Sequence, residues 1–299
     1  MSGTSQPPLQ AVAPSDVTAE SVDPAEVVAA LEADRALVRR RGARVCAALA
    51  ADDVDAVRAF VDTLGRLLRD DDPGVVQAAA AALTEVATAD PDAATPVLDD
   101  ATALADSTLG GVQIAGAQLL GAVAKRRPDR CTPVVAALLD RLVRPPDHTE
   151  SQSVAARVED SVTQRTIQHY EQEERERERV ARQVFANVVV AVAEADPSAL
   201  AGHVETVAEV ATAEDPVVRG AALDILAAVA RESPRAVDPV AETVIACLDA
   251  DERVLRARAV QTLGHLGDER YADALDEIAE TDDDEIAALA AETAAFLDT

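Results

Sequence analysis

The chain has 299 residues, of which 48% are hydrophobic and only 2% aromatic, and its formal net charge is −28 at pH 7. This acidity argues against nonspecific binding to DNA, RNA or anionic membranes, because all three attract a positive surface whose binding releases counterions. The apolar residues are mostly alanine, valine and leucine, which favours thin layers of closely packed helices over one deep globular core.

Residues 1–23 are rich in serine, threonine and proline and have little hydrophobic periodicity, so we expect a disordered leader. No basic region followed by an apolar run precedes the repeats, and the longest apolar stretch, around 188–193, is shorter than the roughly 20 residues of a membrane span. The cysteines, Cys46, Cys131 and Cys247, are far apart and form no CxxC pattern. These features predict a cytoplasmic protein without a membrane segment.

From residue 24 onward, apolar residues recur at a spacing of 37 residues, in two phases. Each repeat has three such positions, with the second 8 and the third 11 residues after the first, so all three lie on one helical face. The first positions are Val38, Val75 and Val112, then Ala181, Val218 and Leu255. The second positions are Cys46, Leu83 and Leu120, then Val189, Leu226 and Leu263. The third positions are Leu49, Val86 and Val123, then Val192, Val229 and Leu266.

Each of these helices also carries a position that is small in all repeats but one, which allows neighbouring helices to approach closely. The small residues are Gly42, Ala79, Gly116, Ala222 and Ala259, with Phe185 as the exception. In four repeats a proline begins the next helix: Pro91, Pro128, Pro197 and Pro234, three of them after a possible capping residue, Asp90, Asp196 or Ser233. The unit is therefore a pair of helices, which must stack on its neighbours to bury its apolar face.

We expect about seven such pairs, with one long insertion in the fourth. The pairs span 24–50, 55–89, 91–126, 128–195, 197–232, 234–267 and 268–299. The fourth is longer than the others by about 32 residues, and the stretch after Pro145 and Pro146 contains neither glycine nor proline as far as Asp196. We therefore predict that the insertion, residues 145–178, forms a long charged helix. It is either a solvated helix or an arm for docking or dimer contact.

The second helices resemble HEAT repeats. Asp215, Pro216, Val218, Arg219, Ala222 and Leu226 look like the second-helix signature of that family, and Asp251, Leu255, Arg256, Ala259 and Leu263 match it again. The resemblance covers nearly the whole chain after residue 23 and implies an all-α, right-handed α-α superhelix, a HEAT-like solenoid, over residues 24–299. It also implies Asp–Arg pairs between neighbouring repeats. The arginine recurs as Arg39, Arg182, Arg219 and Arg256, whereas Val76 and Gln113 depart from it.

The basic residues are almost all arginine, since Lys125 is the only lysine among 27 basic side chains. Together with 55 acidic residues, this composition resembles that of salt-in halophiles of the haloarchaeal type. At molar salt the Debye length is about 3 Å. The acidity would then be an adaptation to the solvent and would not imply a basic ligand.

We expect no catalytic site, cofactor or metal. The four histidines, His148, His169, His203 and His265, are scattered, and no HExxH, GxSxG or glycine-rich phosphate loop occurs. The His-Glu dipeptides of HEAT-like di-iron hydroxylases are absent, as is the basic, aromatic-lined surface of HEAT-like DNA glycosylases. The acidic runs 70–72 and 282–285 precede second helices, where carboxylates cap free N–H groups.

The sequence thus predicts a non-catalytic scaffold or adaptor that binds a protein partner on the concave face of its second helices, on its charged arm, or on both. The alternative is a HEAT-like enzyme, or enzyme subunit, of the lyase or hydroxylase type. The candidate partner-binding residues on the second helices are Gln77, Gln113, Gln118, Arg182, Arg219, Asp224, Arg256 and Gln261. Those on the arm are His169, Tyr170, Glu173 and Arg177.

Overall fold

The computed structural model describes residues 8–9, 17–18, 20–144, 161–281 and 284–298. Every regular element in these ranges is a helix, which confirms the predicted all-α fold. Most of the predicted leader, and residues 145–160 of the predicted insertion, lie outside the described residues. The described part of the leader includes Leu9, Val17 and Val22, whose side chains are buried.

The chain divides into two compact units. The N-terminal unit comprises Met1–Val134 and Pro146–Val184, and the C-terminal unit comprises Val135–Pro145 and Phe185–Thr299. The boundary passes through the fourth helical pair, so pairs one to three belong to the first unit and pairs five to seven to the second. The arrangement of about seven pairs agrees with the repeat count predicted from the 37-residue spacing.

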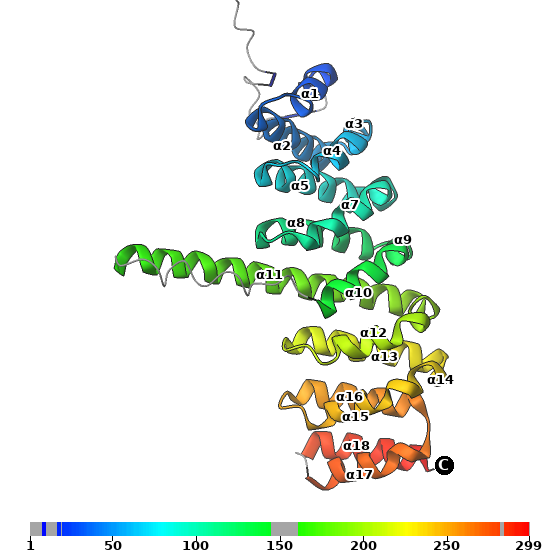
Figure 1. Cartoon of the computed structure of the whole chain (residues 1–299). Helices are drawn as coiled ribbons and strands as arrows, with labels where there is room; N and C mark the ends of the chain where they lie inside the picture. The colour runs from blue at the N-terminus through cyan, green and yellow to red at the C-terminus, as the bar shows by residue number, and fades with distance from the viewer. Residues whose placement is uncertain (1–7, 10–16, 19, 145–160, 282–283, 299) are drawn as a thin grey trace, which may run out of the picture. The chain divides into compact units, whose positions relative to one another are not determined.

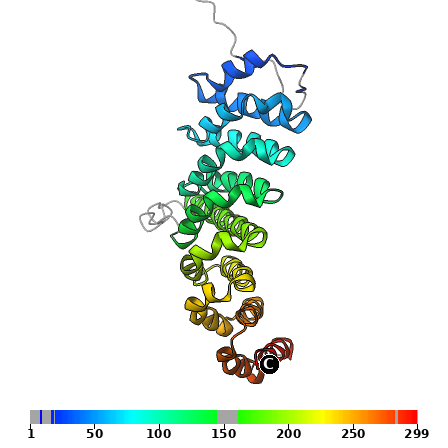
Figure 2. The ribbon, with the colours of Figure 1, turned by 90° about the vertical axis from the view of Figure 1, so that its right-hand side faces the viewer.

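The N-terminal unit is built from three complete helical pairs, stacked in chain order in Figures 1 and 2 (blue to green). The first pair is α1 (Pro24–Leu31) with α2 (Ala36–Asp52), and the second is α3 (Asp55–Arg58) and α4 (Val61–Leu67) with α5 (Pro73–Ala89). The third is α6 (Pro91–Ala94), η2 (Thr95–Val97), α7 (Leu98–Ala103) and η3 (Leu104–Asp106) with α8 (Gly110–Ala124). The fourth begins with α9 (Pro128–Cys131) and η4 (Thr132–Val134).

The C-terminal unit continues the same plan. It begins with α10 (Val135–Val143), and α11 (Ser161–Ala195) enters it from the first unit. The fifth pair is η6 (Pro197–His203) and α12 (Val204–Val210) with α13 (Pro216–Glu232). The sixth is α14 (Pro234–Val237), η7 (Asp238–Val240), α15 (Ala241–Ala246) and η8 (Cys247–Asp249) with α16 (Arg253–Leu266). The seventh is η9 (Glu269–Tyr271) and α17 (Ala272–Thr281) with α18 (Asp284–Leu297).

In three repeats the first helix is interrupted by a short 3-10 turn that contains a proline. The prolines are Pro96, Pro133 and Pro239, in η2, η4 and η7. Proline has no backbone N–H, and its ring clashes with the carbonyl four residues earlier, so an α-helix cannot pass through it unbroken. The single first helix predicted for each pair is therefore divided in these repeats.

Aspartate and proline begin most of the helices. Asp72 accepts hydrogen bonds from the N–H groups of Gly74 and Val75, and Asp215 caps α13 in the same way. Asp90 and Asp196 also cap the helices that follow them, as predicted. Ser233 makes no side-chain capping bond, so that prediction is wrong. Its helix begins instead at Pro234, whose fixed φ suits the first helical position.

The predicted apolar face forms the core of each unit. All eighteen of its side chains are buried, including Leu83 and Leu120 in the first unit and Leu226 and Leu263 in the second, each 0% exposed. The small position also acts as predicted: a Cβ on Gly116 would lie 2.7 Å from the Ala101 carbonyl oxygen. Close contact between the helices of a pair therefore depends on this position.

The long helix predicted in the fourth repeat is α11, of 35 residues. In the N-terminal unit, its turn at Glu174–Glu178 lies against the start of α8, where a Cβ on Gly110 would be 2.6 Å from the Glu174 carbonyl oxygen. The part of α11 that precedes Glu174 continues past the N-terminus of α8 (Figure 1), by about 20 Å at 1.5 Å per residue. We call this part, residues 161–173, the arm.

Candidate partner-binding surface

The surface of interest is formed by the second helices at two positions of the repeat, where every residue except Gly220 is exposed or half-buried. These positions follow the first apolar position by two and by six residues. In the N-terminal unit they hold Arg40, Gln77 and Ile114, then Arg44, Ala81 and Gln118. In the C-terminal unit they hold Gly220 and Ala257, then Asp224 and Gln261. We call the exposed part of these helices the second-helix surface.

Most of the candidate residues predicted on the second helices lie at or near this surface. Gln77, Gln118 and Gln261 are exposed. The half-buried candidates are Arg182, Arg219, Asp224 and Arg256. Burial raises the pKa of Asp224, while the positive charge of Arg258, 2.9 Å from the Asp224 carboxylate, offsets part of that shift.

Gln113 is not on the surface, so its assignment as a partner-binding residue is wrong. Its side chain is 2% exposed, and its amide Nε2 donates to the carbonyl oxygen of Ser107 at 2.6 Å. Arg39 and Arg256 make the same bond to the carbonyl six residues before them, Ala33 and Ala250, at 2.9 and 2.8 Å. The glutamine therefore substitutes for the repeat's arginine as a donor to the turn between the two helices.

The first groove of the surface lies between α2 and α5 and has a volume of about 480 Å³. We call it the α2–α5 groove. It is lined by Arg40, Arg44, Ala47, Gly74, Gln77, Ala78 and Ala81. Its polar groups are two guanidinium groups, which only donate hydrogen bonds, and one amide, whose NH2 group donates and whose oxygen accepts. Its floor is alanine and glycine.

A second groove of about 500 Å³ adjoins the first, because Gln77 lines both. It is lined by Gln77, Leu109, Gly111, Ile114, Glu174 and Arg177. Leu109 is 42% exposed, so an apolar patch lies beside the donors of the first groove. The structure thus brings Gln77 of the second helices together with Arg177 of α11, which the sequence pattern alone did not do.

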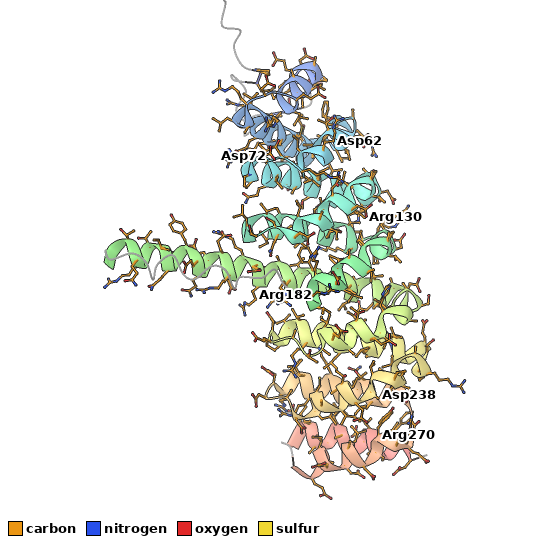
Figure 3. All side chains as sticks on the ribbon, viewed as in Figure 1. Asp62, Asp72, Arg130, Arg182, Asp238 and Arg270 are labelled. Carbon is orange, nitrogen blue, oxygen red and sulfur yellow. The ribbon has the colours of Figure 1, made fainter. Side chains whose placement is uncertain are left out.

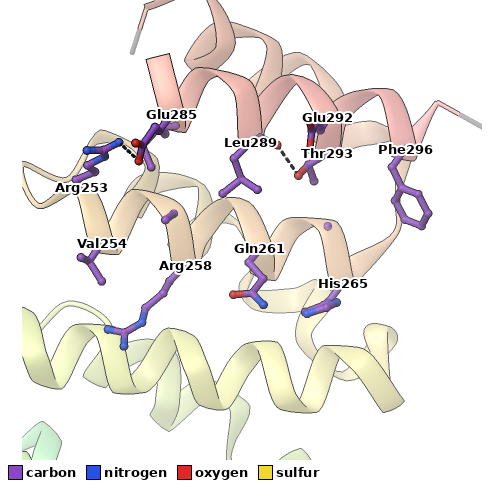
Figure 4. A pocket seen from close by; sticks show the side chains of 13 residues that line it. Arg253, Val254, Arg258, Gln261, His265, Glu285, Leu289, Glu292, Thr293 and Phe296 are labelled. Carbon is purple, nitrogen blue, oxygen red and sulfur yellow. Dashed lines mark hydrogen bonds and ion pairs between the residues drawn. The ribbon is translucent and has the colours of Figure 1, made fainter. Parts of the chain in front are cut away.

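A third groove lies between α16 and α18 and has a volume of about 960 Å³ (Figure 4). Three exposed apolar side chains line it: Val254, Leu289 and Phe296, the last 67% exposed. Arg253 is paired with Glu285 at one end of the groove, and His265 lies toward the other. Burial lowers the pKa of His265, and the nearby Arg231 lowers it further.

The candidate residues on the arm and beside it form a charged, exposed cluster. Tyr170 is 62% exposed. His169 Nε2 lies 3.1 Å from a carboxylate oxygen of Glu173, and Arg177 lies 3.3 Å from the other oxygen of the same carboxylate. The Arg177–Glu173 pair joins largely exposed side chains one helical turn apart, so it is worth about 0.3–0.5 kcal/mol at low salt.

Glu174 belongs to α11 but completes α8. The N-cap position of α8 is Leu109, whose side chain cannot accept a hydrogen bond, and no side chain within the pair replaces it. Glu174 Oε2 instead accepts the bond of the Gly110 N–H at 2.8 Å. A carboxylate at this place also interacts favourably with the helix dipole. The sequence carried one signal of this contact: a leucine stands at the position where Asp72 caps α5 and Asp215 caps α13.

Arginine–aspartate pairs join neighbouring repeats within each unit, as the family resemblance implied. Arg39 donates two hydrogen bonds to the carboxylate of Asp70, from Nε at 2.7 Å and from Nη2 at 2.8 Å. These bonds hold the pKa of Asp70 below its ordinary value, against the opposing effect of burial. Arg270 pairs with Asp238 at 2.6 Å in the C-terminal unit (Figure 3). The pairs between repeats include Arg69–Asp100, Arg127–Asp92 and Arg258–Asp224.

A metal site, a reactive thiol and a membrane span each have requirements that can be compared with the described residues. Among the residues that the structure describes, no group of three or more His, Cys, Asp or Glu side chains is placed to hold a metal ion. Cys46 and Cys131 are buried thiols, and burial raises the pKa of each to about 12. No single described helix has both the length and the apolar character to cross a membrane. Residues 163–195 and 197–210, which are bent by 119° relative to each other, reach that length and apolar character only when taken together.

Stacked helical pairs with buried Val/Leu faces and Asp–Arg pairs between repeats define an α-helical repeat protein of the HEAT and armadillo type. Residues 24–280 match the family described as Adaptin N terminal region, and the chain belongs to that family. The predicted membership of the HEAT-repeat class is thereby confirmed.

Many solved structures have a similar fold, and they include two repeat-length matches of designed or engineered proteins. A crystal structure of an engineered protein has a TM-score of 0.53 and 20% identity, with the match covering 81% of this chain and 97% of that one. A designed armadillo repeat protein has a TM-score of 0.52 and 13% identity, covering 82% and 100%. At these identities the likeness concerns the fold alone. No curated protein matches the sequence.

Proposed function

We propose that the protein is a non-catalytic scaffold or adaptor that holds a protein partner on its second-helix surface. HEAT and armadillo folds are typical of protein-interaction scaffolds. The observation that supports this proposal most directly is the pair of adjoining grooves that share Gln77, where polar donors lie beside the exposed Leu109. Apolar and polar groups side by side in a groove are what a partner segment needs for affinity and for orientation.

The test is affinity capture of the tagged protein from its native cytoplasm at native salt. Gln77→Lys with Gln118→Lys blocks the second-helix surface of the N-terminal unit. Ala59→Lys with Ala103→Lys, both exposed on the first helices, makes the same charge change elsewhere. A partner lost only with the first variant supports the proposal. A partner lost with neither, or no reproducible partner, contradicts it.

The alternative of a lyase- or hydroxylase-type enzyme has no specific support among the described residues. We retain it as an outcome of the same experiment, in which the purified protein would carry a metal or coloured cofactor and no protein partner. The arm is a second contact site for the partner in our proposal, because Tyr170 and its charged neighbours are exposed beside the second groove.

We further propose that the protein works in a salt-in cytoplasm of haloarchaeal type. The supporting observation is compositional: 55 acidic residues against 27 basic ones, with a single lysine. We expect the far-ultraviolet circular dichroism of the purified protein to show full helix in 2 M KCl and a loss of helix as salt is removed, because a net charge of −28 repels itself when unscreened. Equal helicity in 0.05 M KCl would contradict this proposal.

A further inference from the structure

We propose that the α2–α5 groove binds an acidic segment of the partner protein, with Arg40 and Arg44 receiving two carboxylates spaced one helical turn apart. This inference rests on the proposed scaffold function and names the chemistry of the segment that is held. It starts from one contrast: the arginines of this groove are unpaired, whereas others nearby in the N-terminal unit are paired.

The paired arginines show how an acidic chain ordinarily uses this side chain. Arg39, one residue before Arg40, is engaged by Asp70 and by two backbone carbonyls. Arg58 pairs with Asp90, and Arg69 with Asp100. In a chain with twice as many acids as bases, a nearby carboxylate is the default environment of a guanidinium group.

Arg40 and Arg44 depart from that pattern. Neither makes an ion pair or a side-chain hydrogen bond with any residue that the structure describes, and Arg40 Nε is buried without a hydrogen-bond partner. Because no described side chain accepts from these two guanidinium groups, a carboxylate that enters the groove would form charge-assisted hydrogen bonds without displacing an existing partner. The guanidinium of Arg40 is held over Gly74, where a Cβ would lie 3.2 Å from Nη1.

The neighbouring residues leave the two guanidinium groups available to an incoming carboxylate, because none of them forms an ion pair with Arg40 or Arg44. The groove's other lining residues are Gln77, alanines and Gly74, none of which carries a charge. Asp72, the acid at the N-terminal cap of α5, already accepts two N–H bonds of its own helix. The groove is therefore positively charged and complementary to an acidic ligand, although the protein as a whole is strongly acidic.

The spacing sets the geometry of the ligand. Arg40 and Arg44 are four residues apart on α2, which places their Cα atoms about 6 Å apart along the helix axis. Two glutamates at positions i and i+4 of a partner helix have the same spacing. Arginine binds carboxylates through two parallel, charge-assisted N–H bonds, which favours a segment with ionised carboxylates over one with neutral amides.

The experiment uses fluorescein-labelled, alanine-based helical peptides of 20 residues and fluorescence anisotropy with the full-length protein. One peptide has two glutamates at i and i+4, and the matched peptide has glutamines there. The measurement is made at the lowest salt at which circular dichroism shows the native helix content. We expect the glutamate peptide to bind at least tenfold more tightly than the glutamine peptide.

Two variants then locate the site. Arg40→Gln with Arg44→Gln should abolish the tenfold preference. Arg66→Gln with Arg69→Gln, which removes the same charge from α4 and the turn after it, should retain the preference within twofold. No preference in the natural sequence, or an equal loss in both double variants, overturns the proposal. Tighter binding of a twelve-residue oligothymidylate, lost with Arg40→Gln and Arg44→Gln, overturns it in favour of a phosphate ligand.

The failure of this inference can be told apart from the failure of the scaffold function. If the double variant of Arg40 and Arg44 captures the native partner as well as the natural protein does, the acidic-segment inference is wrong. The scaffold proposal would stand in that case, because it is tested by the variants at Gln77 and Gln118.

Discussion

Glu174 accepts a hydrogen bond from the backbone N–H of Gly110, a residue 64 positions earlier in the chain, at 2.8 Å. This bond ties the long helix α11 to the start of α8 within the N-terminal unit. It replaces the local aspartate cap that α5 and α13 have. The long helix is therefore part of the repeat packing from about Glu174 onward.

We expect Glu174→Ala to destabilise the protein by about 0.5–2 kcal/mol, because an N-cap acceptor and a favourable dipole contact are lost. Glu176→Ala, on an exposed side chain of the same helix, is the control and should change the stability by about 0.5 kcal/mol or less. Leu109→Asp in the Glu174→Ala background should restore the stability by supplying a local cap. Chemical denaturation measures the free energy of unfolding of all three variants. If Leu109→Asp restores none of the stability lost in Glu174→Ala, the capping role is contradicted.

The pair Arg39–Asp70 predicts a pH-dependent stability. Asp70→Asn should cost about 1–3 kcal/mol near neutral pH, since one partner of a largely buried, charge-assisted pair is lost. The pKa of Asp70 is lowered in the folded state, so its contribution is present above the ordinary value of 3.8 and is lost as pH falls through the folded pKa.

Thermal melts of the natural protein and of Asp70→Asn should therefore differ at pH 7 and converge in acid. The exposed pair Arg130–Asp92 provides the control, because Arg130→Gln should shift the melting temperature little at either pH. A difference between Asp70→Asn and the natural protein that stays constant below pH 3 would argue against the pairing.

Gln113 offers a test of the hydrogen bond that replaces the repeat's arginine. Gln113→Leu should leave the Ser107 carbonyl without its donor and cost about 1–3 kcal/mol. Gln118→Leu, on an exposed side chain of the same helix, should cost about 0.5 kcal/mol or less. Equal effects of the two substitutions on the denaturation midpoint would show that the buried bond contributes nothing specific.

The register of the repeats is tested at Leu226, which is 0% exposed on α13. Leu226→Arg should cost several kcal/mol, because it places an unpaired charge in the core of the C-terminal unit. Val217→Arg on the same helix, 45% exposed, should be tolerated. Circular dichroism melts measure both, and unchanged melting of Leu226→Arg would refute the assigned register.

The repeat architecture could be predicted from the sequence because it depends on a periodic pattern. The spacing of Val75, Leu83 and Val86 places them on one face of any α-helix. Their recurrence every 37 residues indicates which helices pack together. The capping role of Asp72 was equally local, since its acceptor bonds reach only the next two N–H groups that are free.

The binding surface was only partly predictable. Gln77 was found because an exposed polar residue on a second helix is visible from periodicity, but Gln113 was misplaced, since no pattern shows that its amide turns inward to Ser107. Arg40 and Arg44 were missed because a run of arginines does not show which of them have partners. That distinction requires knowing that Asp70 lies beside Arg39 alone.

The sequence by itself determined the helices, their pairing and the buried face, because these follow from contacts between residues close in the chain or repeated at one period. Only the tertiary structure decided which polar groups are satisfied. Glu174 reaches Gly110 across 64 residues, and Arg40 lies over Gly74 without an ion-pair partner among the described residues, because each position depends on how one helix packs on another. Hydrogen bonds are short-ranged and directional, so their partners are set by that packing and not by the pattern of residues.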